Sequence, residues 1–547
     1  MKRIKQYIMF GAAALMTASC SDFLDTTPYD ALSPSTTWKT EQDAEKFAIG
    51  CYSGWEDGGR LLYMDCTSDF GYNNFSWEGY KDLANGNMTQ ANSGASFYGY
   101  TTIRRCNTFL NNVQSIEFAD EAVKKDLIAQ VRVLRAYKYF IMNWAYGGVP
   151  IIDNYDTAED AQVPRNTEQE VRDFIAKELD ECTPDLNKMP AERGRIAKGA
   201  ALALRMREAL YYDDWAMAKQ KAEEIIAMDE YDLEDDYLKL FQVAGQDSKE
   251  TILAVQYIPN TYTLYTIGQM YNNGDGGWSS IVPTYNLVDT YEMKNGMTID
   301  EQGSGYDATH PFKDRDPRLA MSVIYPGADY VKAGGAAAVF NTLDKTINGE
   351  SNAIYMTSAD NASKTGLTWN KYLSPITQYA DIWKSNACPI VFRYAEVLLT
   401  WAEAENELNG PSDEVYKKIN KVRERAGMPD VDQAKYATKE ALRELIHRER
   451  AVEFAGEGLR RADILRWKTA DGKMLAEKVL NGRLERRIGT VDASVSDPGL
   501  RATITLNPDP TEVLIENRSF QPFHRYFPFS QGDIDKNPKL EQNEGYK

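Results

Sequence analysis

Apolar side chains recur at three- and four-residue steps along much of the chain, the spacing that places them on one face of an α-helix. The longest such stretch stops at Gly147, Gly148 and Pro150, because glycine and proline end helices. The sequence therefore predicts a long helix ahead of residue 147, whose buried face is formed by Ile128, Val131, Leu134, Tyr137, Ile141 and Trp144.

Other predicted helices come in pairs separated by short turns. They span residues 196–212 and 215–228, then 391–408 and 415–426, and a further amphipathic stretch covers 442–454. Small side chains one turn apart, as at Ala218 and Ala222, let a neighbouring helix approach closely. Such pairs predict tetratricopeptide-like units, which bury a core only by stacking, although the usual period of about 34 residues is not kept.

A segment of different character separates the two helical blocks. It contains glycine-rich turns at 272–277 and 333–336, and its Tyr, Trp and Ile residues favour a functional region over disorder. We therefore expect a mainly α-helical protein with a large irregular, loop-rich half. The predicted parts are a helical repeat region over 41–230, a ligand-facing region over 231–390 and a C-terminal region over 391–547 that ends in irregular structure.

The first twenty residues have the order of a bacterial export signal. Lys2, Arg3 and Lys5 precede an apolar stretch over 8–16, and small residues then lead to Cys20. This predicts a signal peptide over 1–19, lipidation of Cys20, and a Ser-, Thr- and Pro-rich tether over 20–40. The alternative is an ordinary signal peptide with a coincidental cysteine. Because the apolar stretch is shorter than the ~20 residues of a spanning helix, acyl chains would form the anchor.

The charge balance and the scarcity of histidine exclude several function classes. Asp and Glu total 81 against 62 Lys and Arg, a net charge of −19, and so acidic a surface repels nucleic acid. Only three histidines are present, too few and too scattered for a His-rich metal centre, and we expect His447 to be solvated or ion-paired in its charged helix. The cysteines beyond Cys20 form no CxxC pair and are expected to be buried small residues.

Sequence motifs for catalysis are missing. The chain has no GxGxxG, no Walker-type phosphate loop, no HExxH and no GxSxG. A carboxylate pair for glycoside hydrolysis stays open, because 81 acidic residues offer many pairs. We therefore expect a binding protein without a cofactor rather than an enzyme.

Aromatic residues gather in two segments that also contain Asn and Gly. The first holds Phe70, Tyr72, Phe75, Trp77 and Tyr80. The second flanks the glycine-rich turn and holds Tyr262, Tyr265, Tyr271, Trp278 and Tyr285. Flat rings beside amide groups suit sugars, whose C–H faces stack and whose hydroxyls need hydrogen bonds. The alternative is that most of these rings pack against helices.

Several short segments, in a fixed order, carry a resemblance to a known family. They are 19–25, 132–137 followed by 146–150, 393–399 with 402–404, 419–427, Glu449, Arg450, Glu453, Glu457 and Gly458, and finally 532–538. In this order they resemble the SusD/RagB family of surface lipoproteins from Bacteroidota, over essentially the whole mature length. The chain departs from the family pattern at 461–463 and 527–530. These motifs look like signatures of the fold, so neither departure affects a chemical role.

The resemblance implies a SusD-like fold and a non-enzymatic role at the outer membrane, facing the cell exterior. Such proteins capture nutrient, usually glycan, and deliver it as a lid to a SusC-like TonB-dependent transporter. Within this fold we expect the glycan site where the two aromatic segments meet, formed by Tyr72, Asn73, Asn74, Phe75, Trp77 and Trp278. Three rivals stay open: a peptide-binding RagB-like protein, a surface glycoside hydrolase and a purely structural repeat scaffold.

Overall fold

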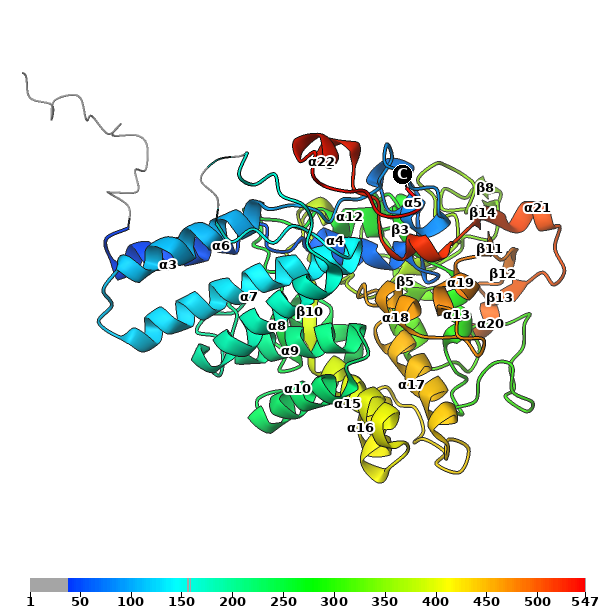
Figure 1. Cartoon of the computed structure of the whole chain (residues 1–547). Helices are drawn as coiled ribbons and strands as arrows, with labels where there is room; N and C mark the ends of the chain where they lie inside the picture. The colour runs from blue at the N-terminus through cyan, green and yellow to red at the C-terminus, as the bar shows by residue number, and fades with distance from the viewer. Residues whose placement is uncertain (1–37, 155–156, 158, 547) are drawn as a thin grey trace, which may run out of the picture.

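The long helix expected ahead of Gly147 is α7 (Glu121–Tyr146), and it lies at the centre of the helical part (Figure 1). This computed structural model describes residues 38–546 except 155, 156 and 158, so Cys20 and the predicted signal peptide lie outside the described residues. Val131 and Leu134 of α7 are fully buried, as the apolar period predicts. The side chain of Asp120 caps the first turn, and Gly147 ends the helix with φ 69°.

The predicted helix pairs are confirmed and form one continuous stack. In it α7 packs on α8, α9 packs on α10, and α10 in turn packs on α15 of the second helical block. Ala218 and Ala404 are fully buried in this α10–α15 contact, so the small-residue seam joins helices far apart in sequence. The helices of the stack are α3 (Glu41–Cys51), α6 (Thr101–Asn112), α8 (Glu168–Cys182), α9 (Lys198–Tyr211), α10 (Trp215–Met228), α15 (Tyr394–Asn409), α16 (Asp413–Arg425) and α17 (Lys439–Glu453).

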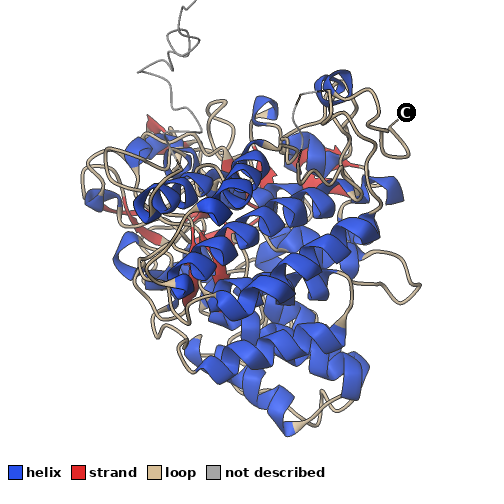
Figure 2. Ribbon diagram, turned by 60° about the vertical axis from the view of Figure 1, so that its left-hand side comes forward, coloured by secondary structure: helices blue, strands red, loops and turns tan. Residues whose placement is uncertain are grey.

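The other half consists of loops, short helices and seven two-stranded antiparallel sheets among the described residues, as Figure 2 shows by colour. The paired strands are β1 (Gly71–Asn73) with β3 (Ile281–Pro283), β2 (Thr251–Ala254) with β10 (Ile390–Arg393), β4 (Val323–Ile324) with β9 (Thr368–Trp369), β5 (Asp329–Val331) with β6 (Ala337–Val339), β7 (Thr346–Ile347) with β8 (Glu350–Ser351), β11 (Gly482–Glu485) with β14 (Leu514–Arg518), and β12 (Gly489–Val491) with β13 (Ala502–Ile504).

Short helices connect these strands and close the chain. They are α4 (Gly58–Tyr63), α5 (Lys81–Asn85), α11 (Tyr237–Leu240), α12 (Thr266–Met270), α13 (Tyr285–Thr290), α14 (Arg318–Ser322), α18 (Arg460–Arg466), α19 (Leu475–Val479), α20 (Pro498–Arg501), α21 (Pro510–Val513) and α22 (Gln531–Lys536). The expectation of an irregular half is therefore confirmed.

A buried network of ion pairs fastens the irregular half to the helices. Arg393, at the end of β10, bonds to carboxylates of Glu250 at 2.7 Å, Glu453 at 2.8 Å and Glu457 at 2.6 Å. Arg318 of α14 reaches Glu453 from the other side at 3.0 Å. Burial alone would raise the pKa of Glu453, but the surrounding guanidinium groups hold it far below its ordinary value. Glu453 therefore stays ionised at neutral pH.

The cysteines agree with the sequence interpretation, and His447 lies against a carboxylate in the helical part. All five cysteines among the described residues are buried free thiols, namely Cys51, Cys66, Cys106, Cys182 and Cys388. His447 Nε2 lies 3.4 Å from a carboxylate oxygen of Glu403, and its ring stacks on Trp467. Burial lowers the pKa of His447, so at neutral pH a neutral ring lies against the Glu403 carboxylate and the contact is not an ion pair.

Candidate ligand-binding face

Pairing of β1 with β3 brings the two aromatic segments together. Tyr72 lies opposite Val282 and Asn73 opposite Ile281. The pairing continues past the strands, since the Asn74 backbone N–H donates to Ser280 O at 2.8 Å. The segment that follows Trp278 therefore runs alongside the segment that leads to Trp77.

Four of the six residues predicted to bind glycan are buried at this junction. Tyr72 packs among apolar side chains, and its hydroxyl accepts a hydrogen bond from Lys81 Nζ at 3.0 Å. Asn73 Nδ2 donates to Ser280 O at 3.1 Å, and Asn74 Nδ2 donates to Asp360 O at 2.9 Å. Phe75 lies beneath Trp77. In this structure these side chains hold the loops together, and a direct contact with ligand stays a prediction.

Trp77 is the most exposed large apolar side chain of the described residues, at 73%. Its ring stacks on Phe75 with the centroids 4.3 Å apart and 28° between the planes. Because Phe75 covers one face of the indole, the other face is fixed in orientation and open to solvent. This is the geometry of a stacking platform.

Trp278 forms a second platform together with two further rings. Its centroid lies 4.9 Å from that of Trp383 and 6.1 Å from that of Tyr265, and Tyr265 and Trp383 are 4.6 Å apart. Tyr265 is 47% exposed and Trp278 38% exposed, while Trp383 is half-buried. We call Trp77, Tyr265, Trp278 and Trp383 the aromatic face.

Gly268 of α12 makes room for the second platform. A Cβ added at this glycine would lie 2.4 Å from the indole ring of Trp383, so any larger residue would displace the ring. The Trp278 backbone N–H donates to Gly268 O at 3.2 Å. Thus α12 positions both tryptophans.

Gln269, the next residue of α12, connects the two platforms. Its Nε2 donates to Glu78 Oε1 at 3.0 Å, and Glu78 directly follows Trp77. The Ser280 backbone N–H donates to Gln269 O at 2.8 Å. Burial raises the pKa of the Glu78 carboxyl even though Asn73 and Gln269 donate hydrogen bonds to it. The aromatic face is therefore one connected region in which rings lie beside amide and carboxyl groups.

Sequence reasoning identified part of this face. Trp77 and Trp278 belong to the predicted glycan site, and Tyr265 belongs to the second ring-rich segment. Trp383 was not singled out, because nothing around it in sequence marks it. A further exposed ring, Tyr262, lies three residues before Tyr265 in the sequence. It stacks on Tyr257 with the ring centroids 5.0 Å apart.

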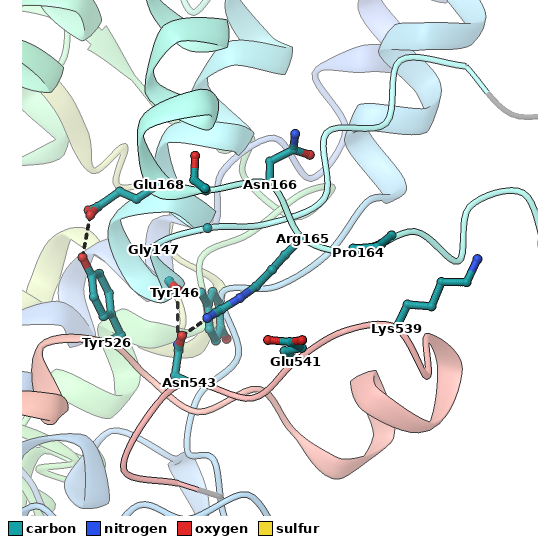
Figure 3. Close-up of a pocket in the computed structure, with 12 residues that line it drawn as sticks. Tyr146, Gly147, Pro164, Arg165, Asn166, Glu168, Tyr526, Lys539, Glu541 and Asn543 are labelled. Carbon is teal, nitrogen blue, oxygen red and sulfur yellow. Dashed lines mark hydrogen bonds between the residues drawn. The ribbon is translucent and has the colours of Figure 1, made fainter.

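A separate groove of about 400 Å³ lies between the end of α7, the start of α8 and the C-terminal segment (Figure 3). Its polar groups are largely bonded to one another. Tyr526 Oη donates to Glu168 at 2.8 Å, Arg165 Nη1 donates to Asn543 Oδ1 at 2.5 Å, and Asn543 Nδ2 donates to Tyr146 O at 3.2 Å. These bonds fasten the C-terminal segment to the helices, so we assign the groove a structural role.

Neither a metal-binding cluster nor a membrane-spanning helix occurs in the described part of the chain. No three His, Cys, Asp or Glu side chains gather there in a way that could hold a metal ion. None of its helices combines the length and apolarity needed to cross a bilayer.

Stacked helix pairs that support an irregular half with exposed aromatic rings define a helical-repeat protein. Its family follows from comparison with known sequences: residues 249–546, more than half of the chain, match the SusD family, and residues 22–210 match a family described as starch-binding and associating with the outer membrane. The chain belongs to the SusD family, and the resemblance seen in the sequence is confirmed.

Individual relatives span nearly the whole chain. A SusD-like protein of Formosa agariphila is 26% identical over 85% of this chain and 90% of its own length. The starch-binding protein SusD of Bacteroides thetaiotaomicron is 24% identical over 81% of this chain and 77% of its own length. The crystal structure of a SusD-like carbohydrate-binding protein from Bacteroides fragilis, 27% identical, covers 92% of this chain and all of its own with a TM-score of 0.79. The SusD-like fold is therefore confirmed.

Proposed function

We propose that this protein captures oligo- or polysaccharide at the cell surface and delivers it, as a lid, to a SusC-like TonB-dependent outer-membrane transporter. The observation that carries the proposal is the aromatic face, where Trp77, Tyr265 and Trp278 expose ring surface beside the amide of Gln269. Rings and amides together match the apolar faces and hydroxyls of sugars. Relatives named as starch-binding or carbohydrate-binding support the same ligand class.

The proposed role is capture without chemistry, with acyl chains on Cys20 holding the protein on the outer membrane and its body facing outward. The basic, apolar, small-residue, cysteine order of the first twenty residues supports this anchor. Replacing Cys20 with Ala should move the protein from the membrane fraction to the soluble fraction and abolish acyl labelling. Unchanged retention without label would contradict the anchor.

The ligand class is tested by affinity electrophoresis and calorimetry of the purified mature protein against a panel of glycans and peptides. We expect saturable binding of at least one glycan and no increase in reducing ends after long incubation. Binding of peptides alone would favour a RagB-like role, and sustained release of reducing ends would show a hydrolase. No ligand of either class would leave only a structural scaffold.

The transporter partnership has its own test. Mild-detergent purification of the tagged protein from native membranes, with the bound glycan present, should recover a TonB-dependent transporter in near-equal amount. A lid needs a large interface, typically above ~2,000 Å² in total, so the pair should survive washing. Recovery of the lipoprotein alone would count against the lid role.

A further inference from the structure

Three basic side chains that form no ion pair among the described residues lie around β1. They are Lys81 at the start of α5, Lys364 in the loop before β9, and Arg486 directly after β11. Among the described residues, none of the three lies within ion-pair distance of a carboxylate, although many other Lys and Arg side chains do. In a chain with 81 acidic and 62 basic residues, such a group is unusual.

The fold brings these three cations together around β1. Lys81 Nζ donates to the hydroxyl of Tyr72, which is the middle residue of β1. The Tyr72 side chain packs with Leu484 of β11 and Ile515 of β14, the strands that hold Arg486. In addition, α5 contacts β14, and the two strands lie near α5 in Figure 1.

The loop that carries Lys364 is fixed to the same strand. Asn74, the residue after β1, donates from Nδ2 to Asp360 O at 2.9 Å and to Ala362 O at 3.2 Å. Lys364 Nζ donates to Ala359 O at 2.7 Å, which holds its ammonium group at the base of this loop. Three segments distant in sequence therefore place one cation each around Tyr72 and Asn74.

The donors of this group are not all used within the chain. Arg486 Nη2 donates to Leu514 O at 3.1 Å, but its Nε and Nη1 atoms are buried without a hydrogen-bond partner. A buried guanidinium donor without an acceptor is costly, and an anion would satisfy it.

The charges of the group also act on one another. Burial lowers the pKa of Lys364, and the positive charges of Arg486 and Lys81 lower it further against the opposing charge of Asp360. Carboxylates also face the group. Asp360 is exposed, Glu516 is paired with Arg518 at 2.8 Å, and although burial opposes it, the Tyr72 hydroxyl and the charges of Glu516 and Asp82 raise the pKa of Lys81. These acids offset part of the positive charge, while the Arg486 donors stay without an acceptor that an anion could supply.

We propose that Lys81, Lys364 and Arg486 form a subsite for an anionic substituent, a carboxylate or a sulfate ester, on the captured glycan. The inference rests on the proposed glycan-binding function and names its ligand class. Trp77 and Lys81 lie four residues apart in the sequence, and the proposal places the anionic group on a sugar unit other than the one that stacks on the indole. Charge-assisted hydrogen bonds of this kind are about twice as strong as neutral ones.

The test compares dextran, carboxymethyl dextran and dextran sulfate, which share a backbone, together with neutral, uronate and sulfated polysaccharides of natural origin. The parent protein should bind at least one anionic glycan more tightly than every neutral one, and added salt should weaken that binding. The Lys364→Gln, Arg486→Gln double variant should lose on the order of tenfold in affinity for the anionic glycan. The carboxylate and sulfate probes show which group the subsite takes.

The matched control is the Lys188→Gln, Lys417→Gln double variant, which removes the same charge at exposed positions distant in sequence. It should bind like the parent, and thermal melts should show all variants folded. If neutral glycans bind as tightly as anionic ones, or both double variants lose affinity equally, the subsite is refuted while glycan capture stands. If no glycan of any class binds, the proposed function itself fails.

Discussion

Removing the exposed indole at position 77 tests the aromatic face most directly. Trp77 is 73% exposed, and Phe75 already covers its inner face at 4.3 Å, so ligand can reach only the outer face. Substituting Trp77 with Ala deletes a platform without opening a cavity in the core. We expect Trp77→Ala to weaken binding of the glycan that the parent binds best.

The size of this loss follows from the exposed surface. An aromatic side chain offers at most ~250 Å² for burial, so about 180 Å² of Trp77 is available, and a sugar on one face covers about half of that. At ~25 cal/mol per Å², the ~90 Å² covered contributes about 2 kcal/mol, or about 30-fold in Kd. Because ordering the ligand offsets part of this gain, we expect Trp77→Ala to raise Kd by about 5- to 30-fold.

Isothermal titration calorimetry measures the effect, and two further variants separate its causes. Trp77→Phe keeps a smaller ring and should lose less affinity than Trp77→Ala. Leu506→Ala removes another exposed apolar side chain, 53% exposed and outside the aromatic face, and should bind like the parent. If Trp77→Ala remains folded and binds as tightly as Leu506→Ala, ligand does not use this ring.

Three further predictions concern stability and pH. Arg393→Met removes one cation shared by three buried carboxylates, each of which keeps another in Arg318, Arg425 or Lys371, so the free energy of unfolding in urea should fall by about 3 kcal/mol, and an unchanged midpoint would contradict the role of the network. Gly86 has φ +82°, and an added Cβ would lie 1.8 Å from Ser519 O, so Gly86→Ala should cost more than Gly472→Ala, where φ is +79° and no atom is near. Burial, aided by the charge of Arg461, lowers the pKa of His524 from 6.5 to about 4, so the stability it contributes is complete above pH 6.5 and is lost as pH falls toward 4. His524→Gln should flatten the dependence of unfolding free energy on pH in this window.

The helices could be predicted because the sequence features that specify them lie within or next to each helix. The apolar period and the Gly-Gly-Val-Pro stop gave the end of α7, and the short turn at 213–214 separated α9 from α10 as the structure has it. The sequence did not reveal that α10 packs on α15. That contact depends on small residues such as Ala218 and Ala404, which lie in different helical blocks. A small residue indicates that a neighbouring helix can pack closely there, but not which helix it is.

Which rings are exposed could not be predicted, because long-range pairing decides it. Phe75 and Trp77 lie two residues apart in the same ring-rich segment, yet Phe75 is buried and Trp77 is not. Pairing with β3, more than two hundred residues away, fixes the strand that leads into this segment, and Trp77 then covers Phe75 from the solvent side. Likewise Trp383 joins the aromatic face only because Gly268 leaves space for it.

The buried ion network explains why a binding face can be built from loops at all. Isolated two-stranded sheets and single-turn helices have little stability of their own, so rings placed on them would be mobile unless another structure held them. Arg393 and Arg318 extend from the irregular half and meet Glu453 of α17, a rigid helix in the stack. The residues that looked in sequence like family signatures, Arg393, Glu453 and Glu457, thus have a physical role. They fasten the irregular half to the helices, and ligand can then bind to rings whose positions are already fixed.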